Sequence, residues 1–385
     1  MKTISFIKRI IQPSSKDGRV VRLNPPQGIS PKGCVVISYI TTPFDGDEIT
    51  AQKARGHTNV GEVLAMVESF IDLGFRVEVC DWDNKVYQPP CDTRVAIDIH
   101  SNLERWKLPK DCIKVLHATG AHWSFQNNAE LMRLEGVKKR RRAALIPRRA
   151  AASSRGAELA DFVVVLGNEF TEETFRFSDK PITRIPISSA YEFPFLENRD
   201  YEKARKRFLW IGSYGMVHKG LDLVLEAFAE MPDLELTVCG RSEKEEDFFK
   251  LYEKELKHTQ NIHFHGWVDM ASSEFAEIAR THASVVYPSC SEGGGGSVIH
   301  CMHAGMIPVC TREASVDLND FGVLIREGSV SSVQETVRKV ASMSPTEVEQ
   351  RARGSWDHVR AEHTLARFRS AFRQFARSII SSLLT

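Results

Sequence analysis

The sequence lacks a long hydrophobic run, and none of its 385 residues lies in a stretch approaching the roughly 20 apolar residues that cross a bilayer. The residues from Met1 to Arg9 interrupt their apolar stretch too early for a secretory signal peptide. The net charge is only +1, because 51 Lys and Arg residues balance 50 Asp and Glu residues. A dedicated nucleic-acid binder is disfavoured, because such proteins are usually strongly basic.

Paired cysteine motifs are absent as well. None of the eight cysteines forms a C-x-x-C, and most lie in apolar runs such as residues 34–37. In a chain of this length the pattern indicates reduced, buried thiols rather than a disulfide framework. Gly (24) and Pro (16) occur in ordinary numbers and hydrophobic residues make up 42%, which excludes fibrous and broadly disordered classes.

Several signatures of common enzyme classes are missing. The chain contains no Walker A sequence, no G-x-G-x-x-G after its first predicted strand and no G-x-S-x-G. A nicotinamide enzyme is therefore disfavoured. Two histidine pairs, His263 with His265 and His300 with His303, each share a face, but neither has a third ligand at a recognisable spacing. We predict no metal site and no cofactor.

The sequence does contain a regular alternation of short apolar runs and helical segments. The first series of predicted strands covers residues 34–40, 75–80, 95–100, 113–117 and 161–167, with a helix at 60–73. The second series covers 207–212, 234–240, 262–264, 284–287 and 307–310, with a helix at 221–230. This alternation predicts two doubly wound α/β domains that face one another. Ligands of such sheets bind at the carboxyl ends of the strands, so we expect the site in the cleft between the domains.

The predicted plan has four parts: a lead-in at 1–30, a first Rossmann-like domain at 31–190, a second at 191–355 and a C-terminal helix at 356–385. Within the last part, apolar residues recur at helical spacing from Leu365 onward. We expect a core helix there, with a membrane-surface helix as the alternative.

The most informative stretch follows the predicted strand at 284–287. Glu292 leads into four glycines and a predicted helix that begins near Ser297. The four glycines are Gly293, Gly294, Gly295 and Gly296. Glycines allow a close backbone approach and positive φ, and a helix N-terminus offers free N–H groups to an anion. The arrangement suits a nucleotide diphosphate, with Glu292 placed to accept hydrogen bonds from hydroxyls.

This stretch resembles the donor-binding signature of retaining family-4 glycosyltransferases with the GT-B fold. The matching positions are Pro288, Ser289, Glu292, Gly293, Gly295, Ala304, Gly305, Pro308 and Val309. A second match spans residues 210–222, where Lys219 stands at the place of the lysine that contacts the donor pyrophosphate in that family. The resemblance covers about residues 205–345 well and the first domain in outline. It implies a C-terminal helix that crosses back to the first domain.

Further positions follow from the same resemblance. Those assigned to the donor besides the glycine loop are Gly212, Ser213, Lys219, Gly240, Arg241, Gly266, Ser297 and His300. Two of them depart from the family pattern, because Ser213 replaces an arginine and His300 replaces the second glutamate. Three interpretations follow: an unusual donor, replacement of the missing charge by Arg241 or Arg312, or loss of activity.

The acceptor side is expected in the first domain. His122, on the loop after the predicted strand at 113–117, is our preferred catalytic histidine. His117, in or at the end of that strand, is either a second candidate or a core histidine, and His100 is a third candidate. A second group, His57, Thr58 and Asn59, precedes the first helix. Thr58 or Asn59 can cap that helix with Glu62 in its first turn, or the group can contact acceptor or phosphate.

A basic stretch from Lys138 to Arg155 contains eight basic residues and no acidic one. Such a patch can dock on anionic lipid, where lipid-linked acceptors lie, or bind a phosphorylated acceptor; the alternative is a solvated face or an internal salt-bridge set. Because aromatic residues are not interleaved, nucleic-acid binding is the least favoured use.

The resemblance implies a retaining, metal-independent, hexosyltransferase-like enzyme of polysaccharide biosynthesis. It would use a UDP-, GDP- or ADP-linked sugar and a glycan or lipid-linked acceptor, in the cytoplasm or at the inner face of the membrane. Lys219 and the glycine loop would hold the pyrophosphate, Glu292 the sugar, and His122 would assist at the acceptor. The alternatives are a catalytically silent GT-B binder or scaffold, kept open by Ser213 and His300, and a nucleotide-sugar epimerase.

Overall fold

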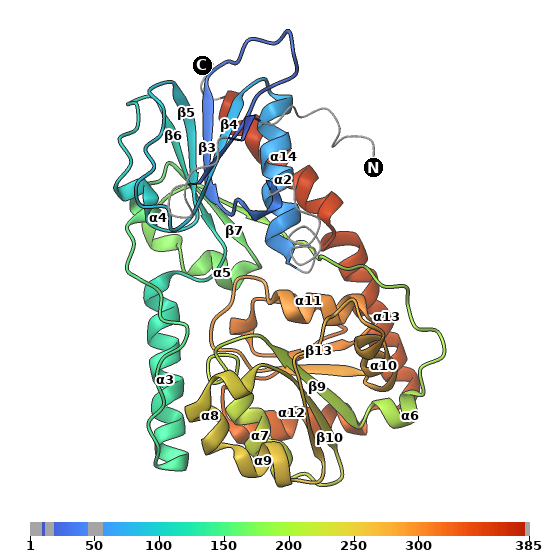
Figure 1. The fold of residues 1–385 in the computed structure, drawn as a ribbon. Helices are drawn as coiled ribbons and strands as arrows, with labels where there is room; N and C mark the ends of the chain where they lie inside the picture. The colour runs from blue at the N-terminus through green and yellow to red at the C-terminus, as the bar shows by residue number, and fades with distance from the viewer. Residues whose placement is uncertain (1–9, 12–18, 45–56, 382–385) are drawn as a thin grey trace.

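The computed structural model describes residues 10–11, 19–44 and 57–381, and within these the chain forms two α/β lobes (Figure 1). The upper lobe contains an eight-stranded sheet in the order β1-β2-β4-β3-β5-β6-β7-β8. Its strands are β1 (Ile10–Ile11), β2 (Val20–Leu23), β3 (Cys34–Tyr39), β4 (Arg76–Asp81), β5 (Thr93–Asp98), β6 (Ile113–Ala118), β7 (Phe162–Leu166) and β8 (Ile182–Ile185). All neighbours from β4 to β8 pair in parallel, whereas β2 runs antiparallel to both β1 and β4.

The lower lobe contains a six-stranded parallel sheet in the order β11-β10-β9-β12-β13-β14. Its strands are β9 (Arg207–Gly212), β10 (Glu235–Gly240), β11 (Ile262–Gly266), β12 (Ser284–Tyr287), β13 (Ile307–Cys310) and β14 (Val323–Leu324). The strand order reverses between β9 and β12, and a ligand crevice of an open α/β sheet is expected at such a switch point. The loops after these two strands carry Lys219 and Glu292.

The predicted fold class is confirmed, and the ten predicted strands lie within one or two residues of their predicted ranges, whereas β1, β2, β8 and β14 were not predicted. The reason is burial on both faces: every residue of β3 and of β12 is buried, so the sequence of each strand is apolar apart from one serine. The longer helices are α2 (Thr58–Asp72), α3 (Trp123–Arg141), α7 (Leu221–Ala229), α10 (Ser273–Thr281), α11 (Gly296–His303), α12 (Val330–Ser342), α13 (Pro345–Glu362) and α14 (Leu365–Ser381). Short helices are α4 (Gly156–Leu159), α5 (Glu169–Glu173), α6 (Tyr201–Ala204), α8 (Glu246–Leu251) and α9 (Glu253–His258).

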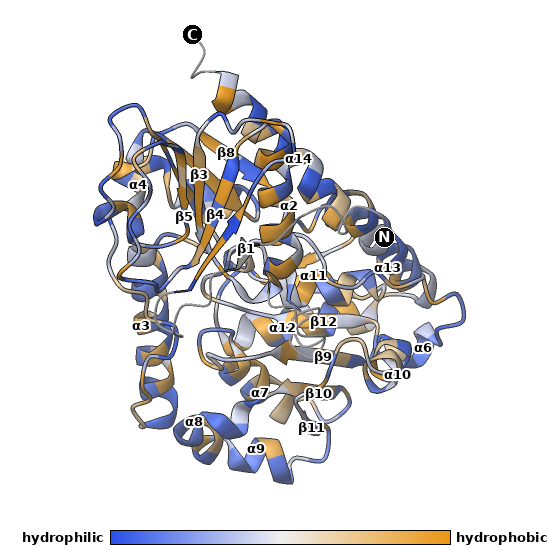
Figure 2. Ribbon diagram, turned by 45° about the horizontal axis from the view of Figure 1, so that its top comes forward, coloured by the Kyte–Doolittle hydropathy of each residue, from blue (hydrophilic) through white to orange (hydrophobic). Residues whose placement is uncertain are grey.

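The chain returns to the upper lobe at its C-terminal end. Helix α13 packs on the lower lobe, and α14 continues upward to lie against α2 (Figure 1). Phe368, Phe372 and Phe375 on α14 are buried, and Figure 2 shows the apolar strands of the upper sheet beside both helices. Arg369 and Arg373 form ion pairs with Glu68 and Asp72 of α2. The apolar stripe of this segment therefore faces the core of the upper lobe.

Helix α3 starts in the upper lobe and extends down beside the lower one (Figure 1). Arg140 binds Asp222 at 2.5 Å and Glu226 at 2.9 Å, and Arg141 binds Glu226 at 3.1 Å and Glu255 at 2.5 Å. Arg148, just beyond the helix, pairs with Asp247 at 2.5 Å. Three arginines of the basic stretch are therefore committed to salt bridges between the lobes and are not available to a membrane surface.

Some sequence predictions fall partly outside the described residues. The lead-in at 1–30 is described only at 10–11 and from 19 onward, the loop before α2 lacks 45–56, and the C-terminal segment is described to residue 381. Among the described residues no helix combines the length and apolar character needed to cross a membrane.

Candidate functional site

Two loops meet at the carboxyl ends of β9 and β12. Lys219 Nζ donates hydrogen bonds to Glu292 Oε1 at 2.7 Å and to the Tyr287 hydroxyl at 2.8 Å. The Tyr287 hydroxyl and Ser289 Oγ also donate to Glu292 Oε1, at 3.0 and 3.1 Å. The side chains of Lys219 and Glu292 are only 8% and 14% exposed. The predicted phosphate-binding lysine and hydroxyl-binding glutamate thus form one nearly buried ion pair.

The charges around Glu292 keep it ionised. Burial raises the pKa of this carboxyl, but the positive charge of Lys219, with further contributions from His218 and Arg149, outweighs burial and holds the pKa well below its usual range. Burial and the neighbouring Glu292 raise the pKa of Tyr287 well above its usual value, so its hydroxyl stays a donor. The site therefore presents a fixed cation and a fixed acceptor side by side.

Two buried groups that the sequence did not single out hold the Lys219 loop in place. Glu245 accepts hydrogen bonds from the backbone N–H groups of Gly215 at 2.5 Å and Met216 at 3.1 Å. His218 faces the carbonyl of Ser291 through Nε2 at 2.6 Å, and its own carbonyl accepts from Cys290 N at 2.9 Å. The loop after β9 is thereby tied directly to the loop after β12. These contacts join segments that are far apart in the sequence, so no local sequence motif predicts them.

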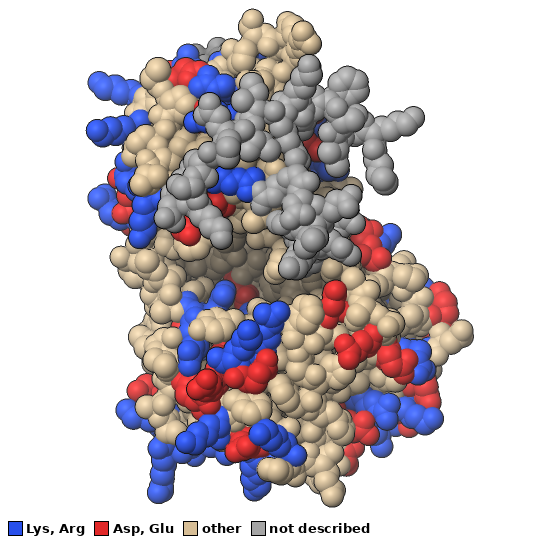
Figure 3. Space-filling view, in the orientation of Figure 1, with Lys and Arg blue, Asp and Glu red and all other residues tan. Residues whose placement is uncertain are grey.

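The glycine loop lies where the two lobes touch. A Cβ on Gly293 would come within 2.5 Å of Thr119 O and 2.6 Å of Gly120 Cα, just beyond β6. Gly294 (φ +100°) lies against Gly167, just beyond β7. Figure 3 shows a hollow between the lobes with basic side chains along its lower edge. At least two of the four glycines therefore permit close contact between the lobes.

We expect Gly293→Ala to destabilise the protein by about 1–3 kcal/mol, because its new methyl group meets backbone atoms of the other lobe that cannot move aside. Urea denaturation measures the effect. Gly296→Ala is the matched control in the same loop, since its nearest neighbour would be Ile187 Cδ1 at 3.5 Å, an ordinary contact. Equal stability of the two variants would contradict a packing role for Gly293.

The glycine loop leads directly into helix α11. Gly295 (φ +52°) is the N-cap residue of α11, and Gly296 and Ser297 form the first turn. Because the N-cap residue is a glycine, it has no side chain that could accept a hydrogen bond from the first N–H groups of the helix. The binding of an anion at this N-terminus stays a prediction.

Other donor-side positions surround the same strand ends. Gly212 and Gly240 end β9 and β10 side by side, and a Cβ on Gly240 would collide with the Gly212 carbonyl oxygen. Gly266 ends β11 with φ +79°. Arg241 is exposed, with its guanidinium 5.1 Å from the centre of the Trp267 ring.

The two departures from the family pattern have different surroundings. Ser213 is exposed, and this position contributes no positive charge to the site. His300 is buried, and its Nε2 accepts a hydrogen bond from Ala190 N at 3.0 Å in the segment that links the lobes. Burial lowers the pKa of His300 to about 4, so the ring is neutral at pH 7. The Nε2 atom of His300 is therefore already bonded to the segment that links the lobes, and only Nδ1 is left for a ligand.

His122 and His100 line one cavity of about 150 Å³ in the upper lobe, together with Trp123, Ser154 and Phe175. His122 is the N-cap residue of α3, and its Nδ1 lies 2.8 Å from Ser124 Oγ. Its Nε2 is a buried atom without a hydrogen-bond partner among the described residues. Burial lowers the pKa of His122, which leaves a neutral imidazole beside the cavity.

His117 does not line this cavity. Its side chain is fully buried, with its ring 5.8 Å from Tyr39 and 6.3 Å from Phe372, and neither ring nitrogen has a partner among the described residues. Burial alone lowers the pKa of His117 to about 4. The catalytic alternative for His117 is thus corrected: the alternating faces of β6 turn this side chain into the core.

The predicted helix cap before α2 is also corrected. The N-cap residue is His57, without a side-chain hydrogen bond, and Thr58 and Asn59 are the first two helical residues. Glu62 does not close a capping box, because it is buried and accepts hydrogen bonds from Ser188 N at 3.1 Å and Ser188 Oγ at 3.0 Å. Asn59 Oδ1 is buried without a partner among the described residues.

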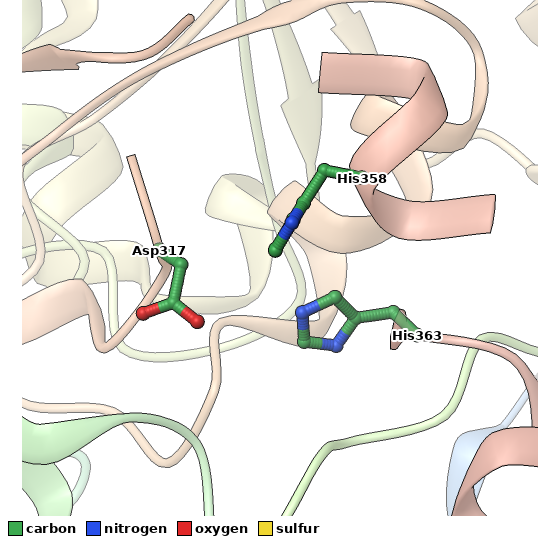
Figure 4. A group of neighbouring side chains, drawn as sticks. All are labelled: Asp317, His358 and His363. Carbon is green, nitrogen blue, oxygen red and sulfur yellow. The ribbon is translucent and has the colours of Figure 1, made fainter. Parts of the chain in front are cut away.

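One group among the described residues could hold a metal ion. Ligand atoms of Asp317, His358 and His363 all lie within 4.8 Å of one another at the junction of α13 and α14 (Figure 4). His363 Nδ1 lies 3.0 Å from Ile187 O, and the His358 ring packs on Phe321. These residues are not part of the Lys219–Glu292 site, and the prediction of a metal-free site stays a prediction.

Residues 205–343 match the family model described as glycosyl transferases group 1. This part of the lower lobe is therefore similar to the group 1 glycosyltransferases. The match contains both Lys219 and Glu292. No curated protein matches the chain.

Solved structures show that this domain is part of a GT-B fold. A mutant form of S. aureus TarM, in complex with fondaparinux, α-GlcNAc-glycerol and UDP, is 13% identical with a TM-score of 0.52 over 73% of this chain and 55% of TarM. Anabaena HepE, with UDP and glucose, is 11% identical with a TM-score of 0.52 over 91% and 99% of the two chains. WaaG, a glycosyltransferase of lipopolysaccharide biosynthesis, is 14% identical with a TM-score of 0.52 over 88% and 98%. The chain spans little more than half the length of TarM.

Proposed function

We propose that the protein is a retaining glycosyltransferase that takes a sugar from a nucleotide-sugar donor. The observation that carries this proposal is the Lys219–Glu292 ion pair at the mouth of a glycine loop, at the strand-order switch of a lobe that is similar to the group 1 glycosyltransferases. UDP in the TarM complex and UDP with glucose in the HepE complex support a nucleotide-sugar donor.

Each group of the site has a role in this proposal. Lys219 and the N-terminus of α11 bind the donor pyrophosphate, and Glu292 accepts hydrogen bonds from the sugar hydroxyls. As the sugar departs, negative charge grows on the leaving phosphate, and Lys219 stabilises that charge without a divalent metal. His122, beside the 150 Å³ cavity, assists a glycan or lipid-linked acceptor.

Transfer is tested by incubating the purified protein with UDP-, GDP- and ADP-sugars, and measuring both thermal stabilisation and slow donor hydrolysis. We expect one nucleotide series to raise Tm and to lose its sugar. The anomeric configuration of a transfer product, read by NMR, tests the retaining course. Stabilisation without hydrolysis or transfer, even with acceptors, would favour the silent binder that Ser213 and His300 keep open.

Membrane docking is retained as a separate proposal in narrower form. The basic residues left for an anionic surface are the exposed ones outside the salt bridges between the lobes, such as Lys139, Arg142 and Arg155. Vesicle flotation with and without anionic lipid tests this docking, and equal binding to neutral vesicles would contradict it.

A further inference from the structure

The donor site as described so far is short of positive charge. A nucleoside diphosphate carries at least two negative charges, whereas the charge of Lys219 is already matched by Glu292 at 2.7 Å. Neither arginine suggested by the sequence is free at the site. Arg312 pairs with Glu173 at 2.6 Å, and Arg241 lies over Trp267 at the far side of β9.

Arg149, from the upper lobe, lies against the Lys219 loop. A Cβ on Gly215 would come within 2.5 Å of Arg149 Cγ and 3.0 Å of Arg149 Cδ, so the arginine stem packs directly on Gly215. Gly215 has φ +84°, and its carbonyl accepts the Lys219 N–H at 2.9 Å. The positive charge of Arg149 is also felt at Glu292 and Tyr287. This side chain therefore reaches the mouth of the donor loop.

The backbone of Arg149 is held firmly while its guanidinium is left unused. Its N–H donates to both carboxylate oxygens of Glu130, at 2.9 and 3.0 Å, and its carbonyl accepts from Gln126 Nε2 at 2.5 Å. The adjacent Arg148 is fixed to Asp247 of the lower lobe. Within the described residues the guanidinium of Arg149 forms no ion pair or hydrogen bond, and the residue is exposed.

We propose that Arg149 supplies the second cation for the donor pyrophosphate, from the lobe opposite to the one that carries Lys219. This inference rests on the proposed function. A guanidinium binds phosphate oxygens in a bidentate manner, and one that is prepositioned loses little entropy on binding. The charge missing at Ser213 is thereby restored across the cleft, and donor binding links the two lobes.

The test measures the affinity of UDP, GDP and ADP, their parent nucleosides, and inorganic pyrophosphate by calorimetry. We expect Arg149→Ala to weaken the preferred nucleoside diphosphate at least 10-fold, to leave the nucleoside within 2-fold, and to reduce the salt dependence of diphosphate binding. The diphosphate affinity of Arg149→Lys should lie between that of the wild type and that of Arg149→Ala. Arg155→Ala is the matched control: it removes an exposed arginine of the same stretch whose N–H is also bonded to a carboxylate, Glu104, at 2.8 Å.

The outcomes separate this inference from the proposed function. Diphosphate binding that is equal in wild type and Arg149→Ala overturns the role of Arg149 and leaves the glycosyltransferase proposal standing. An equal loss with Arg155→Ala also overturns it, because the effect would then be one of general charge. A wild-type protein that binds neither a nucleoside diphosphate nor pyrophosphate overturns both proposals.

Discussion

Lys219→Met is expected to lower kcat by about 10²–10³-fold, since it removes the charge that faces the leaving phosphate. It should also destabilise the fold by about 3 kcal/mol, because Glu292 is left nearly buried without its partner. The double variant Lys219→Met with Glu292→Gln should recover most of this stability, because no uncompensated charge remains. It should not recover turnover, because both functional groups are gone. Urea denaturation and donor hydrolysis measure the two effects independently.

The matched control for this prediction is Lys257→Met. Lys257 forms an ion pair of similar length with Glu253, 2.8 Å, but both side chains are nearly half exposed. Exposed pairs contribute at most about 1 kcal/mol, so this variant should be close to wild type in both measurements. Turnover of Lys219→Met within 10-fold of wild type would refute the assignment of Lys219 to the pyrophosphate.

The sequence predicted the two sheets well because their strands are buried on both faces. The runs that became β3, β9 and β12 are mostly apolar, with single polar residues at Ser38, Arg207 and Ser284, so they can be recognised from the local sequence alone. The Lys219 and glycine-loop motifs were also found, because the strand-loop-helix unit that forms each is local. Their meeting as an ion pair follows from the parallel register of β9 and β12.

The roles of residues that contact a distant segment were not predicted. Arg149 and Arg133 of the upper lobe reach the lower lobe, and Arg133 donates to Pro288 O at 2.9 Å, 155 positions away. Glu245 binds a loop of its own lobe, about 30 positions earlier in the chain. The sequence could not decide between the two alternatives for His117 for the same reason, because Phe372, one of the aromatic rings beside it, belongs to the C-terminal helix. Sequence spacing cannot show which distant element packs over a strand.

The largest effect on stability is expected from acid. Burial lowers the pKa of six histidines to about 4: His117, His218, His282, His300, His303 and His363. In the unfolded chain these rings titrate near pH 6.5, so between about pH 6.5 and 4 the unfolded state binds more protons than the folded one. Stability is therefore complete at pH 7 and is lost as the pH falls through this window, by up to about 3 kcal/mol for one such ring.

Part of this acid sensitivity is located at the connection between the lobes. His300 accepts a hydrogen bond from Ala190 N, His363 faces Ile187 O, and His303 Nε2 lies 3.1 Å from His363 O. The His363 carbonyl also accepts from Ser189 N. Protonation of these rings would place charge among the linker and the α13–α14 junction, so acid should loosen the arrangement of the lobes as well as each core.

His117→Leu isolates one of these rings, because His117 has no hydrogen bond to lose among the described residues. The stability difference between wild type and the variant should shift by about 2–3 kcal/mol in favour of the variant between pH 7 and pH 4.5. Urea denaturation at pH steps across this range measures the shift. His258→Leu, at an exposed position, is the control and should follow the wild-type curve. Parallel curves for wild type and His117→Leu would show that His117 is protonated in the folded protein, contrary to its place in the core.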